Sequence, residues 1–130
     1  MFSPKTHIHL GVEDASRSAV FYEALLRTPP SRRSSSAALF ESGSPPLVLS
    51  LEDAGKGAGK GRRPSRFSML VTDPRQVADA AIALRRAGVR LRLEDEGIRA
   101  EDPDGNAWHV RLAPSGAVPS VRGPQEERHR

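Results

Sequence analysis

An internal repeat divides this chain into two similar halves. Residues 7–26 align with residues 66–85 at a constant offset of 59 positions, and identical residues coincide along the alignment. The coinciding pairs are Val12 and Val71, Asp14 and Asp73, Ala19 and Ala78, Ala24 and Ala83, Leu25 and Leu84, and, just beyond, Arg27 and Arg86. A duplicated unit of this size predicts two like modules rather than one irregular domain.

Both halves have the pattern of a strand followed by a helix and further strands. Residues 6–12 alternate polar and apolar side chains, which is the period of a half-buried strand, and Asp14 is placed to cap a helix. Pro29 and Pro30 end this helix, and Gly88 ends its counterpart in the second half. The expected helices are 15–27 and 73–87, and the expected strands are 6–12, 37–41, 47–52, 66–72, 89–93, 98–101 and 107–112.

These elements are expected to form a single domain over residues 1–112. Module one spans 6–52 and module two spans 65–112. Between them, residues 53–64 are rich in glycine and basic side chains, which predicts a flexible linker. Residues 113–130 consist mainly of proline, glycine, serine and charged residues, so this tail is predicted to be disordered.

Composition excludes several classes of protein. The 130 residues include no cysteine, which excludes thiol chemistry, cysteine zinc sites and a disulfide framework. The net charge is +4, but only 5% of residues are aromatic and the basic residues are dispersed, so no nucleic-acid partner is expected. The first residues lack the apolar run of a signal peptide, and no apolar stretch approaches the roughly 20 residues that span a membrane. We therefore expect a cytoplasmic protein without a membrane partner.

Three motifs occur in order along the chain. The first combines residues 7–14 with residues 21–26, the second is the strand Pro45 to Leu51, and the third is the Asp-Pro-Asp-Gly-Asn-Ala-Trp segment at 102–108. Together they resemble the vicinal oxygen chelate superfamily of glyoxalases, bleomycin-resistance proteins and extradiol dioxygenases, and within it the cadmium-inducible and organoarsenical-lyase branch. The resemblance implies an α+β fold in which two βαβββ modules form a curved, open, barrel-like mixed sheet with a cleft, usually in a homodimer.

The resemblance also implies where a metal ion would bind. In this family the ligands, His or Gln, Glu, His and Glu, lie on the first and last strands of each module, which correspond here to His7, Ser50, Arg66 and His109. Only His7 keeps the expected residue type. Arg66 departs most, because a guanidinium has no lone pair to donate and would repel a divalent cation. The cysteines that bind arsenic in the lyase branch are also missing, so carbon–arsenic lyase activity is not expected.

Strand alternation predicts one polar surface and one apolar surface on the sheets. The residues expected on the polar surface are His7, His9, Ser50, Glu52, Arg66, Ser68, His109 and Arg111. Those expected to pack beneath the helices are Ile8, Leu10, Leu49, Leu51, Phe67, Met69, Trp108, Val110 and Leu112.

Three interpretations of the polar surface remain open. In a metal interpretation, His7, His9, Glu52 and His109 form a rearranged site, because three imidazoles and a carboxylate suit zinc, nickel or iron. In a metal-free interpretation, which we favour, an anionic or aromatic small molecule binds without a cofactor. The residues of this second set are His7, His9, Ser50, Arg66, His109 and Arg111. In the third interpretation, the histidines satisfy one another or face solvent.

The leading functional hypothesis is a glyoxalase- or bleomycin-resistance-like protein that binds a small molecule, for resistance or sequestration, and has a degenerate metal site. The alternative is a metal-dependent lyase, isomerase or dioxygenase with reassigned ligands. A third class is a protein-interaction module that uses a dimer surface. Whether the chain is an enzyme stays open at this point.

Other conspicuous residues have structural explanations. Trp108 is expected on the helix side of the sheet, in the core. Tyr22 is expected to pack along its helix with the hydroxyl at the rim. The acidic run of residues 94–96 precedes Gly97, which predicts a solvated hairpin turn.

Overall fold

The computed structural model describes residues 5–55, 64–114 and 116–123. The elements of the first module are β1 (Thr6–Val12), α1 (Ala15–Leu26), β2 (Arg32–Arg33), β3 (Ala37–Gly43) and β4 (Pro46–Asp53). The elements of the second are β5 (Arg66–Val71), α2 (Pro74–Arg86), β6 (Arg92–Glu94), β7 (Gly97–Glu101) and β8 (Ala107–Leu112), followed by β9 (Ser120–Arg122). Within the described ranges, neither helix is long and apolar enough to cross a membrane.

The strands form two mixed sheets. The first has the order β1-β4-β3-β2, and the second has the order β6-β7-β8-β5-β9. The only parallel pair in each described sheet joins the first and last strands of a module, β1 with β4 and β5 with β8. His7 pairs with Val48 and Arg66 pairs with Ala107, so the register is the same in both modules. The predicted repeat and the α+β fold are confirmed.

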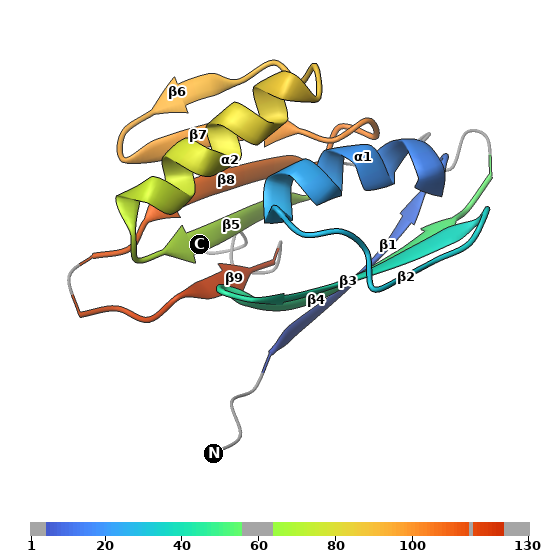
Figure 1. Ribbon diagram of the computed structural model, residues 1–130, viewed down its shortest axis with the longest axis horizontal. Coiled ribbons are helices and arrows are strands. Elements are labelled where there is room, and N and C mark those ends of the chain that lie inside the picture. Colours follow the sequence, from blue (N-terminus) through green and yellow to red (C-terminus); the bar gives the residue numbers. More distant parts are fainter. Residues whose placement is uncertain (1–4, 56–63, 115, 124–130) are drawn as a thin grey trace.

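Both helices lie on the same side of the two sheets (Figure 1). Residues that point toward the helices are buried, including Leu49 and Leu51 on β4 and Met69 on β5. Their sequence neighbours on the opposite side are half-buried or exposed, as the alternation predicts. One continuous apolar core therefore lies between the helices and the sheets. Neither helix covers the opposite, polar side of its sheet.

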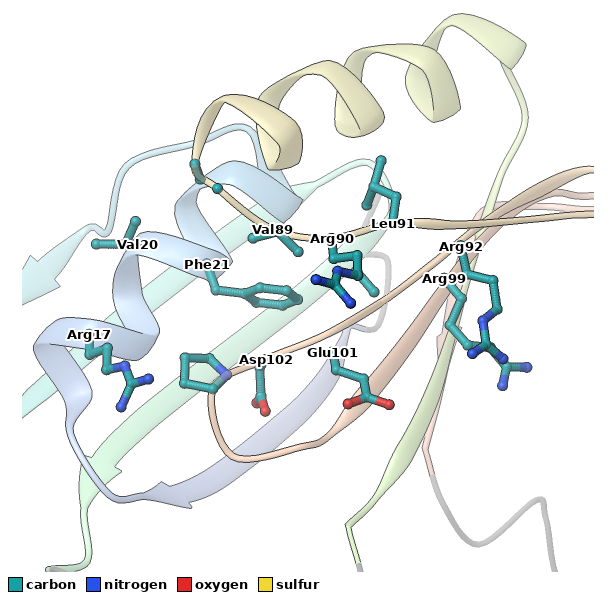
Figure 2. A pocket seen from close by; sticks show the side chains of 14 residues that line it. Arg17, Val20, Phe21, Val89, Arg90, Leu91, Arg92, Arg99, Glu101 and Asp102 are labelled. Atoms are coloured by element: carbon teal, nitrogen blue, oxygen red, sulfur yellow. The ribbon is translucent and has the colours of Figure 1, made fainter.

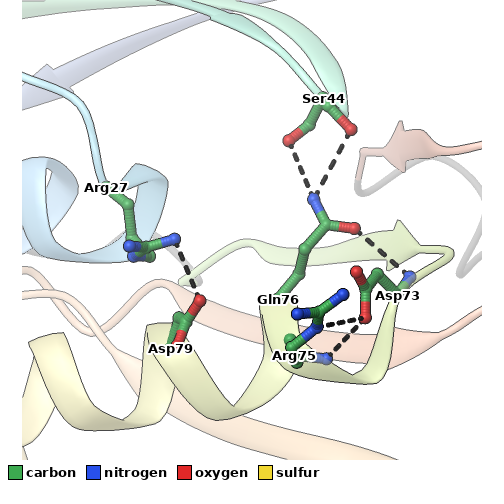
Figure 3. Close-up of polar contacts among 6 residues, drawn as sticks. All are labelled: Arg27, Ser44, Asp73, Arg75, Gln76 and Asp79. Carbon is green, nitrogen blue, oxygen red and sulfur yellow. Dashed lines mark hydrogen bonds and ion pairs between the residues drawn. The ribbon is translucent and has the colours of Figure 1, made fainter.

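Polar side chains fix where the helices start. Asp14 accepts a hydrogen bond from the backbone N–H of Arg17 at 3.2 Å, and Asp73 and Gln76 form a capping box at the start of α2 (Figure 3). Each satisfies backbone donors that a helix leaves unpaired. Gly88, with φ of 84°, follows α2 in the left-handed conformation expected of a terminating glycine.

Several contacts hold the two modules against each other. Gln76 Nε2 on α2 donates to the carbonyl oxygen of Ser44 at 3.4 Å, and Arg27 Nη1 at the end of α1 lies 3.3 Å from Asp79 Oδ2 on α2 (Figure 3). The hydroxyl of Thr6 on β1 donates to the carbonyl oxygen of Val121 on β9 at 3.3 Å. The modules of one chain therefore pack directly on each other.

The core confirms one prediction about aromatic residues and corrects another. Trp108 is completely buried on the helix side of β8, where it stacks on Phe67 at a centroid distance of 4.4 Å. Tyr22 was expected to keep its hydroxyl at the rim, but its side chain is also completely buried. That hydroxyl donates to Asp102 Oδ2 at 2.5 Å and accepts from Trp108 Nε1 at 2.9 Å. A buried hydroxyl needs such partners, and the carboxylate that supplies one is distant in sequence.

Three boundaries differ from the sequence prediction. Part of the tail predicted to be disordered forms β9, which pairs antiparallel with β5 and buries Val121; residues 115 and 124–130 lie outside the described residues. The strand predicted at 89–93 is shifted to residues 92–94. The predicted linker begins later, because Asp53 ends β4 and accepts from the backbone N–H of Ala15; residues 56–63 of the linker lie outside the described residues.

Candidate functional site

Register determines which predicted site residues are neighbours on the polar face. In the first sheet His9 pairs with Ser50, and in the second Ser68 pairs with His109. His7 and Arg66 are exposed near the starts of β1 and β5, on the same side of their strands as His9 and Ser68. The predicted separation of polar and apolar sides is therefore present in both modules.

The polar face of the first sheet carries an ion pair. His9 Nε2 lies 3.2 Å from Glu52 Oε1, and each side chain is 65% exposed. An ion pair with this exposure is strongly screened by water and holds its partners only loosely. His9 and Glu52 are thus brought together as the metal hypothesis requires, but at the surface.

The polar face of the second sheet carries a denser group, which we call the β7–β8 cluster: Glu94, Arg99, His109 and Arg111. Arg99 pairs with His109 across the β7–β8 ladder, and Glu94 approaches both from β6. Glu94 Oε2 lies 3.1 Å from Arg99 Nε, and Glu94 Oε1 lies 3.5 Å from His109 Nε2. Arg111 Nη2 lies 3.9 Å from Glu96 Oε1. The cluster therefore contains two permanent cations and an imidazole, with the half-buried Glu94 beside Arg99 and His109 and the exposed Glu96 beside Arg111.

Three buried nitrogens of this cluster lack a well-aligned hydrogen bond. Arg99 Nε, His109 Nε2 and Arg111 Nε are buried and form no well-aligned hydrogen bond, although Glu94 oxygens lie within ion-pair distance of Arg99 Nε and His109 Nε2. A buried polar group left without a partner costs about 1–3 kcal/mol, and more if it is charged. Unsatisfied donors on one sheet face are the arrangement expected where an anion binds.

Burial lowers the pKa of His109. Loss of hydration is the largest cause; Glu94 opposes it by raising the pKa, while Arg111 and Arg99 lower it further. The imidazole therefore favours its neutral form in the free protein. An anion bound beside it would have the opposite effect, because a negative charge stabilises the imidazolium.

Gly97 allows the cluster to form. It pairs with Arg111 across the hairpin, and a Cβ at residue 97 would clash with the carbonyl oxygen of Val110 and lie 2.8 Å from Arg111 Cα. Only glycine permits so close an approach of the two backbones. The position of Arg111 on the polar face therefore depends on Gly97.

The donor groups do not suit a divalent metal ion. Within the described residues, no group of three or more His, Asp or Glu side chains lies close enough to hold a metal. His109, which the metal hypothesis assigns with His7, His9 and Glu52, lies instead beside Glu94 and two guanidinium groups. Two fixed positive charges next to an imidazole oppose the binding of a cation there. Arg66 likewise offers no lone pair.

Sequence reasoning missed half of the β7–β8 cluster. It followed the first and last strands of each module and so omitted Arg99, which lies on β7, and it interpreted Glu94 as part of a solvated turn. The alternation of Ile98, Arg99 and Ala100 places Arg99 on the polar side, and this signal could have identified it. The role of Glu94 depends on the hairpin register, which residue types alone do not determine.

Comparison with solved structures supports the fold. The chain is similar to a glyoxalase-related enzyme from Fulvimarina pelagi (24% identity, TM-score 0.61, covering 93% of this chain and 98% of that one). It is also similar to a genomically encoded fosfomycin resistance protein from Listeria monocytogenes, solved with Mn(II) and sulfate (18% identity, TM-score 0.62, covering 88% of this chain and 94% of that one). A third similar structure is a lactoylglutathione lyase from Agrobacterium tumefaciens (16% identity, TM-score 0.60, covering 85% of this chain and 94% of that one).

A family model identifies the chain more directly. No curated protein matches it. Residues 6–110, which extend from the start of β1 into β8, match the model of the Glyoxalase/Bleomycin resistance protein/Dioxygenase superfamily. The chain belongs to this superfamily.

Proposed function

We propose that this protein binds a small anionic molecule on the polar face of its second sheet, without a metal cofactor, and acts in resistance or sequestration. The observation that carries the proposal is the set of three buried nitrogens, Arg99 Nε, His109 Nε2 and Arg111 Nε, which form no well-aligned hydrogen bond; Glu94 lies only within ion-pair distance of the first two. A carboxylate, phosphate or phosphonate offers the several acceptor oxygens that such donors lack.

Two further features support an anionic ligand. Arg66 is exposed on the same side of the sheet, where relatives are expected to carry a metal-binding imidazole, and its fixed positive charge replaces a cation electrostatically. Ser68 on β5 pairs with His109 on β8, and its hydroxyl can donate or accept a hydrogen bond.

The experiment is a thermal-shift screen of small carboxylates, phosphates and phosphonates, followed by calorimetry of any ligand that stabilises the protein. Arg111→Gln keeps a polar side chain while removing its charge, and it should weaken binding by about 1.5–3 kcal/mol if the contact is partly buried. Arg66→Ala should weaken binding by about 2 kcal/mol if a ligand buries that contact. Arg85→Gln, an exposed change on α2, is the matched control and should leave affinity unchanged.

Two results would contradict the proposal. One is that no anion stabilises the protein while a neutral compound does. The other is that Arg111→Gln and Arg85→Gln bind a stabilising anion equally well, because the β7–β8 cluster would then take no part in binding.

A further inference from the structure

A large cavity lies between α1 and the edge of the second sheet. Its volume is about 750 Å³, which is within the range of small-molecule sites. It is lined by Arg17, Val20 and Phe21 of α1, by residues 87–92, which run from the end of α2 into β6, and by residues 99–103, which run from β7 into the following turn. Arg99 also belongs to the β7–β8 cluster, but none of the other members of that cluster lines the cavity.

Local structure explains why the cavity is present. β6 has only three residues, so residues 87–91 run from α2 to the sheet edge without strand pairing. α1 is held at a fixed position on the other side, because Tyr22 hydrogen-bonds to Asp102 and Arg27 pairs with Asp79. The space between the connection and α1 is therefore bounded by anchored elements, and the cavity is built into the fold.

The charges lining this cavity are mostly positive. Arg17, Arg90, Arg92 and Arg99 contribute to its wall (Figure 2). In the part of the chain that the structure describes, no ion pair joins the first three to a carboxylate, while Arg99 pairs with Glu94.

The two acidic residues of the lining do not neutralise this charge. Asp102 is buried and committed to Tyr22 and to the backbone of residues 104 and 106, which leaves the exposed Glu101 against the arginines. A concave wall with excess positive charge raises the local concentration of anions.

Apolar side chains occupy the middle of the cavity wall. Figure 2 shows the ring of Phe21 with Val89 beside it, between Arg17 at one end and Arg92 with Arg99 at the other. Val20 is 56% exposed on α1. An apolar surface between cationic ends suits a ligand with an apolar body and an acidic group.

We propose that this cavity is a second binding site, which takes an amphipathic organic anion with an aromatic or branched apolar body and a carboxylate, sulfonate or phosphate group. Arg90, which Figure 2 shows beside Phe21, pairs with the acidic group, while Val20, Val89 and Leu91 contact the body. Apart from Arg99, which belongs to both, this site lies outside the ligand surface of the proposed function, and it does not depend on that function.

The test is calorimetry with 2-naphthalenesulfonate and its uncharged analogue 2-naphthalenemethanol. The proposal predicts saturable binding of the sulfonate at one site per chain and at least tenfold weaker binding of the alcohol. Arg90→Gln should weaken sulfonate binding by about tenfold. Val20→Glu adds a negative charge at the wall that repels the sulfonate, and it should weaken binding at least as much. Both residues are exposed, and circular dichroism checks that the variants are folded.

Two control variants locate the bound probe. Arg85→Gln changes an exposed arginine outside the cavity and should leave sulfonate affinity unchanged, and Arg111→Gln reports any binding of the probe on the polar face instead of in the cavity. The proposal is wrong if the sulfonate does not bind, if the alcohol binds equally well, or if Val20→Glu binds like the unmodified protein. It is also wrong if Arg111→Gln abolishes binding while Arg90→Gln does not, a result that would instead favour the polar-face site.

Discussion

Tyr22 and Asp102 connect the two modules through a buried hydrogen bond of 2.5 Å. Tyr22 lies on α1 of the first module, and Asp102 begins the turn between β7 and β8 of the second. Asp102 also accepts from the backbone N–H groups of Asp104 and Asn106, at 2.9 and 2.8 Å. One carboxylate thus shapes the turn that leads into β8 and fixes it to the helix of the other module.

Replacing the tyrosine hydroxyl should destabilise the protein. Tyr22→Phe removes one of the two hydrogen bonds that the buried Asp102 Oδ2 accepts, the other coming from Asn106 Nδ2, and leaves the buried Trp108 Nε1 without its acceptor. We expect a loss of about 1–3 kcal/mol in the free energy of unfolding, measured by urea denaturation. Val20→Ala, on the exposed side of the same helix, is the control and should cost far less. Equal stability of Tyr22→Phe and the unmodified protein would contradict the importance of this network.

The same tyrosine predicts how stability depends on alkaline pH. Burial raises the pKa of Tyr22 well above its ordinary value, and Asp102 raises it further through its charge and its hydrogen bond. Because the unfolded chain then releases the phenol proton at lower pH than the folded protein, the stabilisation is complete below about pH 10 and is lost as pH rises beyond it. Urea denaturation across this range should show a steeper loss in the unmodified protein than in Tyr22→Phe. Parallel curves would contradict the prediction.

Gly97→Ala should disturb the cluster through the backbone. The added Cβ would meet the carbonyl oxygen of Val110, so β7 and β8 would have to separate locally. We expect a loss of about 1–3 kcal/mol in unfolding free energy together with weaker anion binding. Gly43→Ala is a suitable control, because a Cβ at that position meets no atom within 4 Å. Equal stability of the two variants would contradict the close approach of the β7 and β8 backbones at Gly97.

Dimerisation is a separate expectation. Each sheet has an open edge, at β2 and at β6, and related proteins of this superfamily are expected to cover such surfaces by pairing. We predict a symmetric homodimer with twice the 14.1 kDa mass of one chain. Size-exclusion chromatography with light scattering at tens of micromolar protein measures it, and a clean monomer would contradict the prediction.

The sequence predicts most of the fold and only part of the site. The repeat and the alternation around His9 and His109 indicated the strands, their sides and the two helices, because local periodicity is a property of the chain itself. The pairing of Glu94 with Arg99, the hydrogen bond of Tyr22 with Asp102, and β9 depend on register and long-range packing. A glutamate in a turn has the same local pattern whether it faces solvent or a cluster of cations.

The most direct test of anion binding on the second sheet is the titration of the His109 imidazole by NMR, with and without inorganic phosphate. In the free protein its pKa should lie below the usual value, chiefly because the ring is buried, with Glu94 opposing and Arg111 and Arg99 reinforcing the effect. Phosphate bound beside the ring stabilises the imidazolium, so this pKa should rise on adding phosphate, and the rise should be reduced in Arg111→Gln. A pKa of His109 that phosphate leaves unchanged, or raises equally in Arg111→Gln and the unmodified protein, would contradict the account.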